Sequence, residues 1–417
     1  MKGLLSFLQK GYTPFHVVEE ACKLLEDAGF EQLYEQEKFC VREGGKYYVV
    51  RGGTSLVAFT VGNLDSFRFK IVAAHTDSPA LKLKQQPVEK KCGALTLQTE
   101  PYGGGLWHTF FDRPLKIAGR IVVEQDGKIK SVPYLSPFHV VIPSLAIHLN
   151  RDANTSLSIN AQTDLQPLFS VDEHAKFLSP DVLSHDLYLV ADQAPFTFGE
   201  KGGFIGAPRI DNLTSVYAAL QGLIGCAPTD GVCVAALFDG EEIGSRIYQG
   251  ADGDFLENVL RRLSTALKFD EEEYHQALAA SFAISLDNAH AAHPNHPEKT
   301  DPVNKAVLGG GLTVKRHANK AYATDGESAA ILQAIFDKAG VRYQTFHNRS
   351  DLKSGGTLGG IMLSHVSVRC ADLGIAQLAM HSACECFAKA DYEQAENGIT
   401  AFFSTNLLFD DDGVRLD

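Results

Sequence analysis

The sequence lacks the features that mark several protein classes. None of its windows of 18 or more residues is apolar throughout, and the apolar stretch at 3–8 is interrupted by Gln9 and Lys10. We therefore expect neither a membrane span nor a signal peptide. Basic residues number 38 against 51 acidic ones, which gives a formal charge of -13. This charge disfavours nucleic acid and anionic membrane surfaces as partners.

Cysteine is also scarce. The eight cysteines among 417 residues are scattered and include no CxxC pair, which excludes a disulfide framework and favours a reducing, cytoplasmic location. Low-complexity tracts are absent, and 45% of the residues are hydrophobic against 21% charged, as in ordinary globular proteins. At roughly 150 residues per domain, the length predicts two to three domains.

What the sequence does contain is an alternation of strand-like apolar runs with helix-like segments. This alternation predicts an α/β fold in which a mixed sheet is sandwiched by helices. The expected helices span 14–28, 211–223, 254–267, 271–280, 326–339 and a stretch after 380, and the expected strands span 46–51, 55–61, 68–74, 232–238, 282–287, 343–347 and 364–370.

The middle of the chain has a different texture. From about residue 84 to residue 203 the apolar runs become short and alternating, they are punctuated by Gly and Pro, and no period of 3.6 residues is visible. We therefore predict an inserted β-rich domain at 85–203, which interrupts a catalytic domain formed by 1–84 and 204–417.

Residues of the types that bind metals stand where the predicted strands end. Because the carboxyl ends of strands in an open α/β sheet border one crevice, these side chains are expected to converge. Imidazoles and carboxylates without a thiolate suit a hydrolytic centre rather than a structural zinc site. The set comprises His75 and Asp77, then Asp239, Glu241 and Glu242, then Asp287, with Asp211 at a helix start and His381 after an apolar stretch.

Each of these residues has a simpler interpretation when it is taken singly. A lone histidine after a strand, such as His75 or His381, is more often a hydrogen-bonded loop residue. An acidic pair such as Glu241 and Glu242 is usually a solvated turn, and Asp211 alone would usually be a helix N-cap. Only the complete set favours a metal centre.

Five motifs in chain order resemble the M18 family, the aspartyl aminopeptidases. The resemblance extends from the first helix to the C-terminal region, and the first and fourth of its blocks together distinguish this family from other dinuclear aminopeptidases. The five motifs are Ala74–Pro79, Ile210–Leu213, Asp239–Ser245, Asp287–Asn295 and Met380–Ser382.

The resemblance implies a centre of two divalent metal ions, zinc first, with manganese or cobalt as alternatives. In this centre Asp211 would bridge the two ions. His75 and Asp287 would complete one site, and Glu242 and His381 the other. The resemblance further implies that Glu241 is the general base and that Asp77 orients the imidazole of His75.

The resemblance also implies a substrate class and an assembly. Peptides with a free N-terminus, preferably Asp or Glu, would be bound by Lys315, Tyr322, His290, and His148 of a partner subunit. The assembly would be a homo-oligomer built from dimers, a dodecamer, with the inserted domain serving in dimerisation and as a lid. Without the resemblance, the basic cluster around Lys315 would be interpreted as a solvated loop.

Two other functions stay open at this stage. A broad-specificity aminopeptidase or a deacylase could use the same scaffold, particularly because Lys353 and Ser354 replace the Pro-Cys common in the family. A catalytically silent shell or cargo-binding protein is the second alternative. The intact set of five ligands, together with Glu241, is the sequence feature that disfavours it.

Overall fold

The computed structural model describes residues 1–227 and 229–417. Its largest element is a nine-stranded mixed sheet, in which β13, β4 and β14 are adjacent and parallel. The predicted α/β fold with a sheet between helices is confirmed. In spatial order the strands are β1 (Glu31–Leu33), β2 (Lys46–Arg51), β3 (Ser55–Val61), β13 (Val232–Phe238), β4 (Phe69–His75), β14 (Phe282–Leu286), β18 (Arg369–Gly374), β16 (Leu312–Arg316) and β17 (Tyr343–His347).

Helices cover both faces of this sheet because its central strands are apolar on both sides. Within β13, Cys233, Ala235 and Leu237 pack into one core, and the alternate residues pack into the other. The first core includes α1 (Lys2–Lys10), α2 (Pro14–Asp27), α3 (Ile210–Gly225), α6 (Gly326–Ala339) and α8 (Lys389–Ser404). The second includes α4 (Phe255–Ala266), α5 (Glu271–Ala279) and α7 (Leu358–Met362). Among the described residues, no helix is long and apolar enough to cross a membrane.

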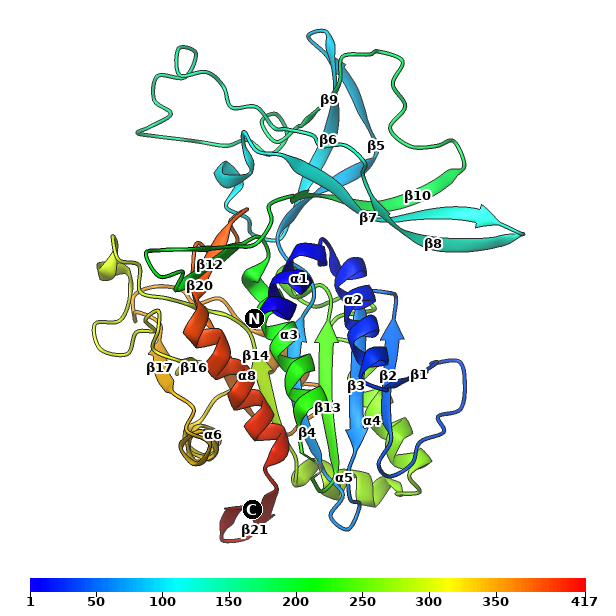
Figure 1. Ribbon diagram of the computed structural model, residues 1–417, viewed down its shortest axis with the longest axis vertical. Helices are drawn as coiled ribbons and strands as arrows, with labels where there is room; N and C mark the ends of the chain where they lie inside the picture. The colour runs from blue at the N-terminus through cyan, green and yellow to red at the C-terminus, as the bar shows by residue number, and fades with distance from the viewer. Residues whose placement is uncertain (228) are drawn as a thin grey trace.

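The segment between β4 and α3 forms a separate six-stranded antiparallel sheet with its own core. Figure 1 shows this sheet beyond the ends toward which β4 and β13 point. Its spatial order is β8 (Lys128–Leu135), β7 (Leu115–Gln125), β10 (Val182–Ala191), β5 (Ala80–Lys91), β6 (Ala94–Tyr102) and β9 (Leu168–Ser170), and the 3-10 helix η1 (Trp107–Phe110) follows β6. The β-rich character expected from the sequence is thus present. The proposed domain bounds of 85 and 203 stay a prediction.

A smaller five-stranded sheet combines two strands that follow β10 with three strands from later in the chain. It comprises β11 (Phe196–Phe198), β12 (Phe204–Ala207), β20 (Glu385–Ala388), β19 (Ala376–Leu378) and β15 (Ala289–His290). The remaining elements are the 3-10 helices η2 (Glu241–Ile243) and η3 (Pro297–Lys299) and a C-terminal hairpin of β21 (Leu407–Asp410) and β22 (Gly413–Leu416).

Two details of the sequence-based prediction are wrong. The strand expected at 364–370 begins only at Arg369, where pairing with Phe282 of β14 starts, because α7 and the turns after it occupy the preceding residues. The stretch after Met380 is not helical throughout. Strand β20, which pairs with β12, precedes α8.

Candidate metal centre

Three adjacent parallel strands bring polar side chains to one edge of the large sheet. Every residue of β13, β4 and β14 is buried. Because these strands are parallel and adjacent, the polar residues at their carboxyl ends meet at one edge of the sheet, which faces the inserted sheet (Figure 1). His75 is the last residue of β4, and Asp287 follows β14 directly. Glu241 and Glu242 lie in η2, just after β13.

Two further residues reach this edge from the five-stranded sheet. Asp211 is the second residue of α3, which follows β12, and its peptide bond to Asn212 is cis. His381 lies in the turn between β19 and β20, with a φ of 67°. Because β12 pairs with β20, the two segments that carry these residues are held side by side.

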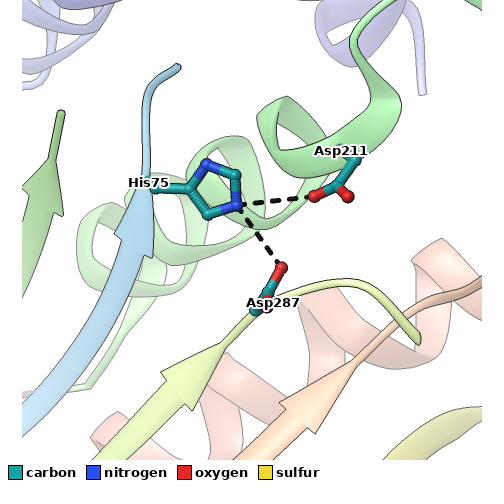
Figure 2. Close-up of side chains that lie close together, drawn as sticks. All are labelled: His75, Asp211 and Asp287. Carbon is teal, nitrogen blue, oxygen red and sulfur yellow. Dashed lines mark ion pairs between the residues drawn. The ribbon is translucent and has the colours of Figure 1, made fainter. Parts of the chain in front are cut away.

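Asp211 stands between the two imidazoles. His75 Nε2 lies 3.5 Å from Asp211 Oδ1 and 3.4 Å from Asp287 Oδ1 (Figure 2). On the other side of Asp211, His381 Nε2 lies 3.4 Å from Asp211 Oδ2 and 3.3 Å from Glu242 Oε1. Each oxygen of one carboxylate therefore faces a different histidine.

These distances suit ligands of a shared cation. Two ligand atoms that each lie roughly 2.0–2.2 Å from one tetrahedral ion are about 3.3–3.6 Å apart. Asp211 Oδ1 and Glu242 Oε1 are also buried acceptors without a hydrogen-bond partner in the described part of the chain, as expected of groups that bind something else. Three groups have ligand atoms within 4.8 Å of one another: His75, Asp211 and Asp287; His75, Glu241 and Glu242; and Asp211, Glu242 and His381.

The electrostatics of the cluster also favour bound cations. Burial raises the pKa of Glu241 to about 8 and that of Glu242 to about 7. Burial acts to lower the pKa of His381, but its contacts with Asp211 and Glu242 outweigh this effect and raise the value to about 11. A proton on the imidazole thus offsets buried carboxylate charge, which a divalent ion would offset more fully.

Asp77 connects several parts of the centre. Its side chain is only 1% exposed. Oδ1 accepts a hydrogen bond from the Glu241 N–H at 3.2 Å and lies 3.3 Å from His75 Nδ1, and Oδ2 accepts from the Glu242 N–H at 3.1 Å. His75 Nδ1 also lies 3.1 Å from the Asp77 carbonyl oxygen. Asp77 therefore orients one imidazole and the turn that carries both glutamates.

The predicted substrate residues occupy different surroundings. Lys315 lies in β16, only 2% exposed, so the interpretation of its surroundings as a solvated loop is wrong. Its ammonium donates to the Asn288 carbonyl oxygen at 3.0 Å, lies 3.4 Å from Asp287 Oδ2 and sits 5.2 Å from the ring centroid of the buried Tyr322. His290 is exposed at the end of β15.

His148 is not brought to this cluster within its own chain. It is exposed in a long loop of the inserted region, between β8 and β9, and belongs to none of the three ligand groups. Its predicted role therefore depends on a second subunit.

Sequence reasoning missed two residues that contact the centre. Glu385, only 2% exposed, accepts hydrogen bonds from the backbone N–H of Asp211 at 2.9 Å and of His381 at 2.6 Å. A lone acidic residue at the start of β20, which is otherwise without charge, was a usable signal for it. Tyr102 donates to Asp77 Oδ2 at 2.9 Å, and no local pattern distinguishes this tyrosine from the others in the inserted region.

Known proteins resemble this chain along nearly its whole length. The profile of the family described as "Aminopeptidase I zinc metalloprotease (M18)" matches residues 7–180 and 168–403. A probable M18 family aminopeptidase 2 of Clostridium novyi (strain NT) is 38% identical over 401 residues, covering 91% of this chain and 92% of the relative. A protein of the same description from Pseudomonas fluorescens (strain SBW25) is 38% identical over 428 residues, covering 98% of both.

Solved structures agree with the sequence matches. A chain in the cryo-EM structure of the Ape4 and Nbr1 complex superposes with a TM-score of 0.92 at 31% identity, covering 96% of this chain and 84% of that one. The structure of the S. cerevisiae mApe1 dodecamer gives a TM-score of 0.83 at 28% identity, covering 96% and 95%.

Proposed function

The chain belongs to the M18 family of zinc metallopeptidases and is an aminopeptidase, and from this premise we propose that it uses two divalent metal ions and prefers peptides that begin with Asp or Glu. Zinc is the first candidate for both ions, and manganese and cobalt are the alternatives because the same imidazole and carboxylate ligands accept them.

The position of Asp211 carries the proposal of two ions. Its two oxygens contact different histidines, at 3.5 and 3.4 Å, and it belongs to two of the three ligand groups. Together, His75 and Asp287 would hold one ion, Glu242 and His381 the other, and Asp211 both.

The proposed catalytic roles fall to the acidic residues of the centre that are not assigned as metal ligands. Two cations, when bound, would supply a Lewis acid for the scissile carbonyl and would make a water molecule more acidic. Glu241 shares the turn of Glu242 but lies outside both groups that contain Asp211, so its carboxylate is free to take a proton from water and to pass it to the leaving amine. Asp77 would keep His75 and this turn in place.

A cationic pocket supports the preference for acidic peptides. The protein as a whole carries a charge of -13, which repels an acidic substrate, so binding requires a local positive region. A pocket of about 270 Å³ beside His290 is lined by Lys299, Arg349 and Lys353, and no aspartate or glutamate is among the described residues that line it. Arg349 is paired with Asp351, so Lys299 and Lys353 supply the net positive charge. Lys315 supplies a further positive charge next to Asp287.

We assign the inserted region, 85–203, to dimerisation and to covering the site, and 1–84 with 204–417 to catalysis. The long loop before β9 exposes apolar side chains, including Leu145 (60%) and Leu149 (74%), on either side of His148. Such a surface suits contact with a second subunit, from which His148 would reach the partner's substrate. A homo-oligomer built from dimers is the proposed assembly, and a dodecamer is the proposed size because the similar S. cerevisiae mApe1 structure is described as one. A cytoplasmic location is proposed because all eight cysteines are free.

The test combines metal analysis with substrate comparison. Purified protein should contain two zinc ions per chain, hydrolyse Asp- and Glu-anilides faster than the Leu-anilide, and lose this activity on chelation. Equal rates on all three anilides would support a broad-specificity aminopeptidase instead, and cleavage of the N-acetylated anilides would support a deacylase. No hydrolysis by metal-loaded protein would support the silent shell.

A further inference from the structure

A short segment of the inserted region contacts the metal centre of its own chain. This segment, 102–106, runs from the end of β6 to the start of η1, and it contacts the proposed ligands Glu242 and His381. Gly103, with a φ of 70°, is so close to Glu242 that an added Cβ would meet the Glu242 Cβ at 3.1 Å. The segment therefore packs against a proposed ligand without a side chain between them.

The backbone of this segment holds His381 at two points. The Gly104 carbonyl oxygen lies 2.9 Å from His381 Nδ1, and the Leu106 N–H donates to the His381 carbonyl oxygen at 2.9 Å. Because a carbonyl oxygen can only accept a hydrogen bond, Nδ1 must carry the proton. Nε2, which faces Asp211 and Glu242, is then the nitrogen that would give up its proton and bind a metal ion.

The side chain of Tyr102 holds the other half of the centre. Its hydroxyl donates to Asp77 Oδ2 at 2.9 Å, and Asp77 in turn contacts His75 and the backbone of Glu241 and Glu242. Burial, the charge on Asp77 and the charge on Asp239 raise the pKa of Tyr102 far above its ordinary range. The phenol is therefore a neutral donor at every physiological pH.

We propose that segment 102–106 is a positioning element of the metal centre in its own chain, in which Tyr102 orients Asp77 and the Gly104 carbonyl fixes the tautomer of His381. The inserted region would then act on two subunits at once. It orients ligands in its own chain and offers His148 to a partner. This inference rests on the proposed two-metal function, because it concerns the ligands of that centre.

Tyr188 provides a matched control for Tyr102. It lies on β10 of the same sheet, its ring packs against that of Tyr102 with centroids 5.5 Å apart, and both rings line one small cavity. Within the described residues, no hydrogen bond joins its hydroxyl to the metal centre. Tyr102→Phe and Tyr188→Phe each remove the phenol oxygen of a half-buried tyrosine, but only the first removes a hydrogen bond to Asp77.

The first experiment measures zinc retention against a competing chelator in wild-type protein, Tyr102→Phe and Tyr188→Phe. Removal of such an outer partner typically lowers metal affinity or activity by about 10- to 100-fold. We expect a loss of this size in zinc affinity and in kcat for Tyr102→Phe, with KM within about twofold and the thermal midpoint of the metal-free protein equal to that of Tyr188→Phe. Equal zinc affinity in the two variants would overturn the role of Tyr102.

The second experiment addresses the backbone contact. Leu106 has a φ of -80°, close to the value that proline imposes, so Leu106→Pro removes the N–H donor to His381 at little conformational cost. Leu106→Ala serves as its control, since it shortens the side chain and keeps the N–H. The proline variant should release zinc faster than the alanine variant, and equal release rates would overturn the role of this contact.

These outcomes are separable from failure of the proposed function. If wild-type protein binds fewer than two zinc ions or cleaves no peptide, the two-metal proposal fails. If wild-type protein behaves as proposed and both matched pairs retain zinc equally, only the positioning role of segment 102–106 fails. Zinc retention requires no turnover, so it decides between these cases directly.

Discussion

The two large sheets of this protein are built for different surroundings. The central strands of the nine-stranded sheet are buried on both faces. The inserted sheet has strands with exposed positions, such as β8, where only two of eight residues are even half-buried. Apolar side chains remain in contact with solvent there, including Ile129 (66%) and Leu183 (58%).

This difference in burial corresponds to a difference in the proposed roles of the two sheets. Packing on both faces fixes the position of a strand in the sheet. The residue at its carboxyl end is therefore held in the place that a metal ligand requires. A sheet with a free apolar face has surface left over for another molecule. The proposed ligands accordingly lie at the ends of buried strands, and the proposed intersubunit residue His148 lies in an exposed loop of the inserted region.

The largest effect on activity is expected from Glu241→Gln, which removes the proposed base at the carboxyl edge of the nine-stranded sheet. Turnover should fall by roughly 10²- to 10⁴-fold, while about two metal ions per chain remain, as elemental analysis would show. Glu242→Gln makes the same chemical change one residue further on and should instead release metal. A Glu241→Gln variant with near wild-type activity would remove the proposed base from the mechanism.

A matched pair of leucines measures the difference in packing. Leu237 of β13 is fully buried, whereas Leu183 of β10 is 58% exposed. We expect Leu237→Ala to lower the free energy of unfolding by about 2–5 kcal/mol, and Leu183→Ala to change it by less than about 0.5 kcal/mol. Urea unfolding of both variants checks this, and equal losses would contradict the contrast between the sheets.

A substitution at Lys315 tests whether the catalytic region alone selects acidic substrates. Lys315→Ala should lower kcat/KM more for an Asp substrate than for a Leu substrate. The difference in lost transition-state stabilisation should be about 2–4 kcal/mol if the ammonium contacts the substrate carboxylate in a desolvated site. Lys353→Ala removes an exposed charge from the neighbouring pocket, and its effect should stay below about 1 kcal/mol. An equal loss on both substrates would show that Lys315 serves Asp287 rather than the substrate.

Subunit mixing tests the contribution of the inserted region across an interface. His148→Ala and Glu241→Gln proteins should each be nearly inactive alone. After joint unfolding and reassembly, half of randomly formed dimers are mixed and each regains one of its two sites, so about a quarter of wild-type activity should return. Confirmed mixed assembly without recovered activity would rule out a role for His148 in a partner's site.

The two regions also differ in how far the sequence predicted them. The strand at 232–238 was predicted with the bounds observed for β13, because a strand buried on both faces is a continuous apolar run with sharp ends. His75, Glu241, Glu242 and Asp287 were placed at one edge for the same reason. The order of the strands, by contrast, depends on pairing between distant segments, and no local pattern carries it.

The misses have similar physical causes. The strand expected at 364–370 was displaced because pairing with β14 sets the register. Lys315 was interpreted as part of a basic cluster, which describes neighbours in the chain, while the residues that bury it, Asp287 and Tyr322, come from other elements. Tyr102 and Glu385 act on atoms far away in the chain, Asp77 and the backbone of Asp211, so only the folded structure reveals what these two residues contact.

The central claim is that Asp211 binds both metal ions at the carboxyl edge of the nine-stranded sheet. The metal content of the protein tests this claim most directly. Elemental analysis of wild-type protein, Asp211→Asn and Asp287→Asn, each dialysed under identical conditions, should give two ions, well below one ion, and about one ion per chain. Asp211→Asn weakens both sites, whereas Asp287→Asn weakens one. A single ion in wild-type protein, or the same content in the two variants, would contradict the account.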